Sequence, residues 1–379
     1  DGQQELYILT NLADVWAPLH TNVSGLKSLA GSFYLDVFAE GCENFIRNQT
    51  LQALLKDQKF DVAIFHMVAM CEFGLTHLLD IKSIIWMSSG LLYDNQAWTQ
   101  NIPVPYSHIP QLLSHFDDKM TFRQRLFNIV RYLTFHYTDA MFNNGLQTKV
   151  YRKIYGPSFP DLLNDIAPRS KWIWTNNDLF LDFARPIVDR LTYIAGVGMP
   201  DVAAKKHSLN AQWREALDEA VDGVVLFSLG SITNTDGMPL EWKTSFLNAF
   251  SRFPTYTFIW KLDSKIEDSS ITIPQNVIVT QWMPQNDLLA STRVKGFITH
   301  GGFNSLMEAT MAGIPLIMIP LFWDQFRNAN NAVSRGVGIM LTKRQIVDPE
   351  RLYTVLRDML YNKRMRTCLL LTPPLFQDS

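Results

Sequence analysis

The stretch FITHGGFNSLMEA, residues 297–309, carries the densest signal in the chain. An apolar strand runs into two glycines and then into a helix with one apolar face. The glycines let the backbone approach a ligand closely, and the unpaired N–H groups of a helix start favour a pyrophosphate. His300 could donate to a phosphate oxygen, and Glu308 could accept from ribose hydroxyls. A helix cap is the alternative, because Ser305 followed three residues later by Glu308 also fits a capping box, which needs no ligand.

Around this stretch, short apolar runs alternate with helical patterns. This alternation predicts an α/β fold with a parallel, doubly wound sheet, in which ligands bind beyond the carboxyl ends of the strands. The predicted strands are residues 224–229, 256–260, 277–280, 297–299 and 316–319. The predicted helices are residues 240–253, 288–291, 305–312 and 326–335, followed by a helix that Asp348, Pro349 and Glu350 open with a cap, a proline and an acidic first turn.

Three other turns follow strands of the same predicted sheet. The indole of Trp282 could stack on a flat base and Gln285 could pair with its edge, although packing is the commoner role of such a tryptophan. Asp324 and Gln325 suit sugar hydroxyls, although an aspartate before a helix is commonly a cap. Ser231, in the turn after the first strand, could contact phosphate. Together with residues 299–305, these turns offer chemistry for each part of a nucleotide sugar.

The first half of the chain is richer in helix. Apolar runs at residues 62–65 and 84–87 predict buried strands, and residues 122–137 predict an amphipathic helix. Prolines, glycines and a polar run loosen the pattern between residues 182 and 210, which predicts a linker. We therefore expect two domains, residues 1–195 and residues 196–379.

Composition narrows the class of protein. A length of 379 residues usually means two domains, and 47% apolar with 18% charged residues suits a globular chain with a large core. The net charge of -2 gives no basic excess, so nucleic acid is not an expected partner. The three cysteines, Cys42, Cys71 and Cys368, are too few and too scattered to predict a disulfide framework or a zinc site, and no metal site is expected.

Signals for a secretory compartment are weak in the sequence itself. Two glycosylation triplets occur, at Asn22 and Asn48, but such triplets also arise by chance. The chain shows no signal peptide and opens on Asp1 rather than methionine, which suggests a fragment. No run reaches the roughly 18 apolar residues that cross a bilayer. The best candidate, residues 314–323, holds two prolines and is expected to be a buried strand.

The span from Trp282 to Gln325 resembles the signature of the UDP-glycosyltransferases, and the turn at residues 227–231 resembles the animal UDP-glucuronosyltransferase branch. The resemblance covers roughly residues 35–365 and is most specific in the second half. It implies two Rossmann-like domains facing across a cleft, the GT-B architecture, with the first domain incomplete at its start. Residues 1–195 would bind a small lipophilic acceptor, and residues 196–379 would bind the UDP-sugar.

The resemblance also implies a role for each matching residue. Trp282 would stack on uracil, Gln285 would pair with it, and Glu308 would hold the ribose. Asp324 and Gln325 would hold the sugar. The residues that would surround the pyrophosphate are Ser231, His300, Gly302, Asn304 and Ser305. The implied reaction transfers a hexose, glucuronate above all, from the UDP-sugar to an acceptor hydroxyl, with inversion, without a metal and with no cofactor besides the donor.

The chain departs from the family at the catalytic base. The family's histidine lies far before a strand that resembles residues 60–65, so we expect it upstream of Asp1. The family's aspartate partner, just after that strand, is His66 here. His66 is a weak candidate for the base, since a packed or capping histidine is the commoner case, and Glu72 is another. The chain also ends in Thr372-Pro373-Pro374-Leu375, where the family continues into further helix and, in animals, a transmembrane tail.

These departures leave rival functions open. A fragment or pseudoenzyme could bind UDP-sugar without turning it over, and the absent base segment favours that alternative for this chain. A UDP-sugar epimerase is a further alternative, which the paired Trp282 and Asp324 turns disfavour. The resemblance implies the lumenal side of the endoplasmic reticulum and association with its membrane.

Overall fold

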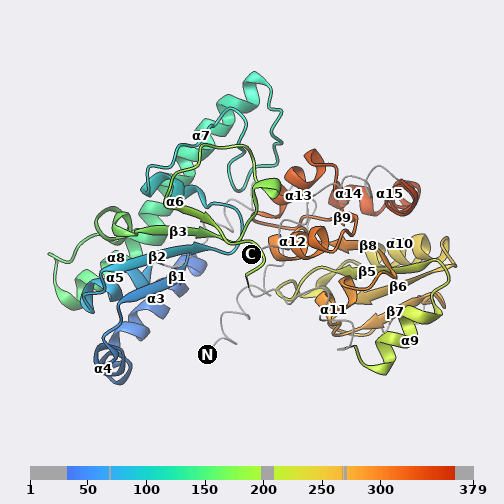
Figure 1. The fold of residues 1–379 in the computed structure, drawn as a ribbon, viewed down its shortest axis with the longest axis horizontal. Coiled ribbons are helices and arrows are strands. Elements are labelled where there is room, and N and C mark those ends of the chain that lie inside the picture. The colour runs from blue at the N-terminus through green and yellow to red at the C-terminus, as the bar shows by residue number, and fades with distance from the viewer. Residues whose placement is uncertain (1–31, 68–69, 198–208, 267, 269–270, 363–379) are drawn as a thin grey trace. The chain divides into compact units, whose positions relative to one another are not determined.

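The computed structural model describes residues 32–67, 70–197, 209–266, 268 and 271–362. These residues form two compact units (Figure 1), an N-terminal unit that ends at Val197 and a C-terminal unit that follows it. The second glycosylation triplet lies on the surface, where exposed Asn48 caps a helix, but Asn22, Cys368 and residues 372–375 lie outside the described residues.

The N-terminal unit holds a four-stranded parallel sheet in the order β1-β2-β3-β4. The strands predicted at residues 62–65 and 84–87 are confirmed as β1 and β2. The linker predicted between residues 182 and 210 was wrong in part, because it contains β4. This strand has only three residues and lies between prolines and glycines. The strands are β1 (Val62–His66), β2 (Ser83–Ser88), β3 (Trp172–Thr175) and β4 (Leu191–Tyr193).

Helices cover this sheet and bring distant parts of the chain together. Tyr151 is fully buried, its hydroxyl donates to the Cys71 carbonyl at 2.6 Å, and its ring leaves no space for a side chain at Gly74. The helix predicted at residues 122–137 is confirmed as α7. The helices are α3 (Ser32–Arg47), α4 (Gln49–Gln58), α5 (Cys71–Leu78), α6 (Asp94–Thr99), α7 (Phe122–Thr138) and α8 (Gly145–Tyr155).

A disulfide joins Cys42 of α3 to Cys71 at the start of α5. The expectation that the cysteines form no disulfide framework therefore missed one bridge. The two residues lie 29 positions apart on different helices, and only the tertiary packing around Tyr151 brings them within bonding distance. Sequence spacing alone carries no signal for such a pair.

The C-terminal unit confirms the predicted parallel, doubly wound sheet. Its six strands lie in the order β10-β9-β8-β5-β6-β7, and every neighbouring pair is parallel. Every residue of β5 is buried, as expected for a strand covered on both faces. The strands are β5 (Gly223–Ser228), β6 (Tyr256–Lys261), β7 (Val277–Thr280), β8 (Val294–Thr299), β9 (Leu316–Met318) and β10 (Gly338–Met340).

The predicted helices of this unit are present, one of them shifted, but the helices at residues 211–219 and 343–346 were not predicted. The short helix expected at residues 288–291 begins three residues earlier, directly after Pro284. Asp348 caps the last helix as predicted, accepting from the backbone N–H groups of Glu350 and Arg351. The helices are α9 (Ala211–Glu219), α10 (Leu240–Ser251), α11 (Gln285–Leu289), α12 (Phe303–Met311), α13 (Gln325–Ser334), α14 (Lys343–Ile346) and α15 (Pro349–Tyr361).

The strand order reverses at β5. From β5 the chain adds β6 and β7 on one side, and β8, β9 and β10 then follow on the other. A stacked pair of rings on one face of the sheet, Phe227 of β5 and Trp260 of β6 with centroids 4.9 Å apart, fixes these two strands against each other. Open parallel sheets bind ligands at such a reversal, so the carboxyl ends of β5 and β8 are the expected place.

No helix among the described residues is long and apolar enough to cross a bilayer.

Candidate functional site

All four predicted turns follow carboxyl ends of strands in the sheet of the C-terminal unit. The turn with Ser231 follows β5 and the turn with His300 follows β8, so these two flank the strand reversal. The turn with Trp282 follows β7, and the turn with Asp324 follows β9. The predicted ligands of phosphate, base and sugar are therefore brought to one edge of one sheet.

Two glycines enclose the imidazole of His300. A side chain at Gly302 would place its Cβ 2.3 Å from Nε2 of His300, and one at Gly230 would lie 2.9 Å from Cε1. Gly230 also has a φ of 88°, in the left-handed region that favours glycine. The ring therefore lies directly between the β5 turn and the start of α12, where backbone N–H groups are unpaired.

The protonation of His300 suits a neutral donor. Burial, together with the charge of Lys261, lowers its pKa from 6.5 to about 4, so the ring is neutral at pH 7. Nδ1 lies 3.3 Å from the hydroxyl of Thr299. With that hydroxyl donating to Nδ1, the proton of the neutral ring sits on Nε2, the atom beside Gly302. His300 can then donate one hydrogen bond toward the helix start.

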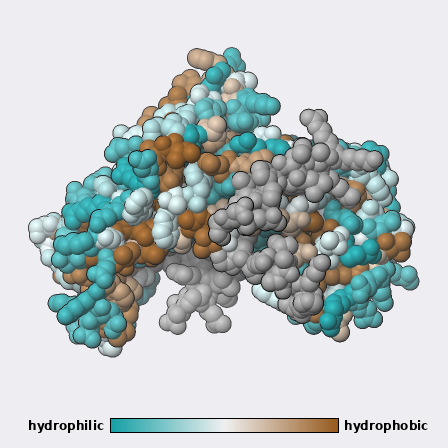
Figure 2. All heavy atoms as spheres, viewed as in Figure 1, coloured by the Kyte–Doolittle hydropathy of each residue, from teal (hydrophilic) through white to brown (hydrophobic). Residues whose placement is uncertain are grey.

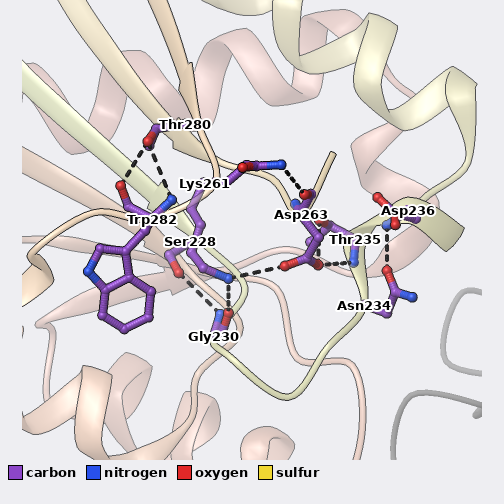
Figure 3. Close-up of polar contacts among 10 residues, drawn as sticks. Ser228, Gly230, Asn234, Thr235, Asp236, Lys261, Asp263, Thr280 and Trp282 are labelled. Carbon is purple, nitrogen blue, oxygen red and sulfur yellow. Dashed lines mark hydrogen bonds and ion pairs between the residues drawn. The ribbon is translucent and has the colours of Figure 1, made fainter. Parts of the chain in front are cut away.

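Lys261, which sequence reasoning missed, ends β6 with its ammonium group buried at this edge. Nζ donates to the Gly230 carbonyl at 3.0 Å and lies 3.5 Å from Oδ1 of Asp263 (Figure 3). The other oxygen of Asp263 accepts from the backbone N–H and the hydroxyl of Thr235, at 2.7 and 2.9 Å. A positive charge is therefore hydrogen-bonded to the backbone of the turn that follows β5. The only sequence signal was a lysine closing the apolar run YTFIWK, residues 256–261.

Gln285 and Glu308, predicted to contact base and ribose, meet in the structure. Nε2 of Gln285 donates to Oε2 of Glu308 at 2.6 Å and to the hydroxyl of Ser305 at 3.2 Å. The capping-box alternative is wrong, since α12 begins at Phe303 with Gly302 as its cap residue, and Ser305 is already helical. The loop after β7 therefore reaches across the sheet edge to α12.

The exposure of Trp282 contradicts the alternative that this tryptophan packs in the core. Its side chain is 70% exposed and its ring stacks on no other ring among the described residues. Its backbone is held instead, because the Thr280 hydroxyl donates to the Trp282 carbonyl at 2.7 Å and accepts from its N–H at 3.4 Å. Figure 3 shows the indole without polar contacts. A large apolar ring on a fixed backbone is suited to stack on a ligand.

The turn after β9 is tied to the His300 turn. Asn328 donates to Oδ2 of Asp324 at 2.7 Å and to the Gly301 carbonyl at 3.1 Å. Burial raises the pKa of Asp324, an effect that the bond from Asn328 opposes in part. The side chain of Asp324 makes no cap bond to α13, so the cap alternative fails although the residue occupies the cap position. Trp323 has a φ of 54°, a strained conformation for a residue other than glycine.

Gln325 is buried and partly committed to the fold. Its Oε1 accepts from the backbone N–H groups of Leu321 and Phe322, at 2.8 and 3.1 Å. Only its amide nitrogen is therefore left to face a sugar. Ser231 and Asn304 are both exposed, on the β5 turn and in the first turn of α12.

The candidate bases lie in the N-terminal unit. His66 ends β1, and its Nε2 lies 2.9 Å from the hydroxyl of Ser89. Desolvation lowers the pKa of His66 from its ordinary 6.5, which favours the neutral ring. Glu72, the other candidate, lies in the first turn of α5. Burial of Tyr151, and to a smaller extent the charge of Glu72, raise the pKa of Tyr151. No cluster of potential metal ligands occurs in the part of the chain that the structure describes.

A comparison with known sequences identifies a family whose model matches most of the chain. The family model described as UDP-glucoronosyl and UDP-glucosyl transferase matches residues 8–376. The chain is 32% identical over 333 residues to ugt-48 of Caenorhabditis elegans, covering 87% of this chain and 62% of that protein. It is 27% identical over 376 residues to UDP-glucuronosyltransferase 1-2 of Rattus norvegicus, covering 98% of this chain and 67% of the relative. The chain spans about three fifths of the length of several relatives.

Comparison with solved structures gives the fold. The glycotransferase of kitacinnamycin is similar with a TM-score of 0.62 at 19% identity, covering 90% of this chain and 77% of that one. Phytolacca americana UGT2, solved with UDP-2fluoro-glucose and pterostilbene, gives a TM-score of 0.55 at 16% identity, covering 85% of this chain and 72% of that one. These neighbours are GT-B glycosyltransferases, which confirms the predicted fold class.

Proposed function

Because the chain belongs to the UDP-glucoronosyl and UDP-glucosyl transferase family, we propose that it transfers a hexose, glucuronate foremost, from a UDP-sugar to a hydroxyl of a small lipophilic acceptor. The observation that carries the proposal is a single sheet edge that holds both the neutral His300 at a helix start and the exposed indole of Trp282. The C-terminal unit would hold the donor, and the N-terminal unit would hold the acceptor.

The donor would lie along this edge in three parts. Uracil would stack on Trp282 beside Gln285, and the ribose would take over the Glu308 oxygen that Gln285 now occupies. The diphosphate would lie among Ser231, His300, Gly302, Asn304 and Ser305. Asp324 and the amide nitrogen of Gln325 would hold the sugar.

We propose that no metal ion is needed at the diphosphate. The buried ammonium of Lys261, the neutral N–H of His300 and the N-terminus of the nine-residue α12 all favour negative charge at one place. These groups can stabilise the leaving diphosphate in a single inverting displacement at the anomeric carbon.

Transfer also needs a base, because a neutral hydroxyl attacks slowly without one. His66 offers a neutral ring nitrogen at the carboxyl end of β1, but the bond to Ser89 engages it. The alternative, UDP-sugar binding without turnover by this chain, gains support from that engagement.

The disulfide supports an oxidising compartment. Bonds like Cys42–Cys71 persist in the secretory pathway and are rare in the cytosol. Exposed Asn48 uses its carbonyl oxygen to cap α4, which leaves its amide nitrogen available for a glycan. We therefore propose a glycoprotein on the lumenal side of the endoplasmic reticulum. A mobility shift on deglycosylation that Asn48→Gln abolishes would support glycosylation at this position.

The function is tested by separating binding from turnover. Calorimetry with UDP, UMP and uridine in the presence of a chelator measures the donor site alone, and we expect UDP to bind most tightly. Radiolabelled UDP-glucuronate and UDP-glucose with a panel of phenols measure transfer. Absence of UDP binding by folded protein, or binding only with a divalent ion, would refute the donor site. Transfer that His66→Ala abolishes would make His66 the base, and transfer that survives this change would place the base elsewhere.

A further inference from the structure

A small hollow opens on the N-terminal unit where α5 ends and β2 begins. Its volume is about 110 Å³, which gives room for several water molecules or for one small ligand. Ile84 of β2 and Ile166, from the segment that ends at Arg169, line it and are buried. In Figure 2 hydrophilic and apolar spheres lie side by side over the part of the N-terminal unit where Figure 1 labels α5 and β2.

The hollow lies at the amino end of the sheet, whereas ligands of open parallel sheets bind at the carboxyl end. Ser83 begins β2 and Ser88 ends it, so about 16 Å of strand separate the two ends. His66, the candidate base, ends β1 beside Met87, at the other end. Pockets for drug-sized ligands measure roughly 300–1,000 Å³. The hollow is therefore too small for a nucleotide sugar or for the proposed acceptor.

The wall that α5 contributes is held by hydrogen bonds. The N–H of Ile81 donates to the Thr76 carbonyl at 2.9 Å, and Asp80 between them has a φ of 57°. This arrangement is the Schellman ending of a helix, which satisfies carbonyls at the negative end of α5. The ring of His77 packs edge-on against Phe159, with centroids 5.3 Å apart. The hollow is therefore preformed, and a ligand would not have to order its walls.

The charges that line the hollow favour an anion. Asp80 is acidic, but its carboxylate is already paired with Lys82. Arg169 is exposed and uses Nε to donate to the Asp165 carbonyl at 2.8 Å. The two terminal nitrogens of Arg169 have no hydrogen-bond or ion-pair partner in the described part of the chain. A guanidinium with both terminal nitrogens available matches the two oxygens of a carboxylate.

A second positive charge lies beside the hollow. The ammonium group of Lys171 donates to the hydroxyl of Ser83, the first residue of β2, at 3.1 Å. Neither Lys171 nor Arg169 pairs with a carboxylate among the residues that the structure describes. The buried isoleucines offer an apolar surface below these charges. The lining therefore combines a positive rim with an apolar floor.

We propose that this hollow binds a small aliphatic carboxylate, whose two oxygens accept from the terminal nitrogens of Arg169 and whose short carbon chain lies on Ile84 and Ile166. Inorganic phosphate fits less well, because it has no apolar part to cover the isoleucines. A neutral alcohol of the same length would leave the guanidinium without its partner. The site lies within the N-terminal unit, so the inference does not depend on the proposed sugar transfer.

A series of ligands tests the proposal on the unchanged full chain. Ligand-observed NMR titration should give butyrate a dissociation constant on the order of 1 mM. Each methylene added from acetate to butyrate should tighten binding about fourfold. Octanoate should gain nothing further, because the hollow is already filled. Both 1-butanol and inorganic phosphate should bind at least about tenfold more weakly than butyrate.

Substitution of Arg169 tests the charged contact. Arg169→Gln should weaken butyrate binding at least about tenfold, and Arg169→Lys, which keeps the charge but loses the fork, should restore part of it. Arg123→Gln is the matched control, since Arg123 is exposed on α7 and does not line the hollow. Urea denaturation checks that each variant is folded.

Four outcomes would overturn the proposal. Acetate and butyrate could bind equally, which would show that the isoleucines take no part. Phosphate or 1-butanol could bind as tightly as butyrate, which would exclude a carboxylate with an apolar chain as the ligand class. Butyrate affinity could stay unchanged in folded Arg169→Gln, or could fall equally in the Arg123→Gln control, and either result would place the binding elsewhere.

Discussion

The carboxylate of Glu308 accepts from Gln285 at 2.6 Å, and no cap of α12 depends on it. We therefore expect Glu308→Gln to weaken UDP binding by about 1.5–3 kcal/mol, the range for a hydrogen bond to a charged group, with little change in stability. Calorimetry and urea denaturation measure the two effects. Glu350→Gln is the control, since that exposed residue pairs with Arg252 on the surface. Unchanged affinity in Glu308→Gln would remove the ribose assignment.

Lys261 places a buried charge beneath the Gly230 turn. Replacement by methionine keeps the volume but removes the charge, so UDP affinity should fall about tenfold or more while uridine binding stays the same. The exposed Lys265→Met is a matched control four residues away. An equal loss for UDP and uridine would show that Lys261 acts on the fold of the edge rather than on the phosphates.

The buried His300 makes the free energy of unfolding of the C-terminal unit depend on pH. Its folded pKa of about 4 lies below the ordinary 6.5, so the unfolded chain binds the proton first. This contribution to stability is present above pH 6.5 and is lost as the pH falls toward 4. We expect a loss on the order of 1–3 kcal/mol over that interval from this residue. Urea denaturation should show a smaller decline in His300→Gln than in the parent, and equal declines would contradict the assignment.

At the scale of elements, the cap of α15 is a prediction from sequence that the structure confirms. Oδ1 of Asp348 accepts from two backbone N–H groups, each at 3.1 Å. Asp348→Ala should lower stability by about 1 kcal/mol, whereas Asp348→Asn should retain most of it. Urea denaturation of both variants measures this, and equal stability of Asp348→Ala and the parent would show that the cap is dispensable.

Some elements of the fold and site were predictable from the sequence, and others were not. Strands such as β5 and β6 were predictable because a strand buried on both faces is a continuous apolar run. Strands β4 and β10 have only three residues each and, unlike the equally short β9, lie in no long apolar run. The turns of the site were found because glycines and polar residues follow those strands. The meeting of Gln285 with Glu308 was not, because it depends on the path of the loop after β7.

At the scale of the whole molecule, the two units should respond separately to reductant and to ligand. Closing 29 residues with the Cys42–Cys71 bond stabilises the N-terminal unit by about 3–4 kcal/mol in the chain-entropy account. We expect calorimetric melting with reductant to lower one transition, and UDP to raise the other. Cys368→Ser is the control and should change neither. A single transition that moves with both additions would show that the units melt together.

The strand order also governs how the protein is made. Of the six strands in this sheet, β5, β6 and β7 leave the ribosome first and can pair with one another. The edge of β5 that receives β8 stays open until the chain has been synthesised beyond Thr299. An open edge on a strand that is fully buried in the finished sheet is a template for wrong pairing. The enclosure of His300 between Gly230 and Gly302 can therefore form only after β8 has joined β5, and a nascent chain that stalls before that point leaves this edge of β5 exposed.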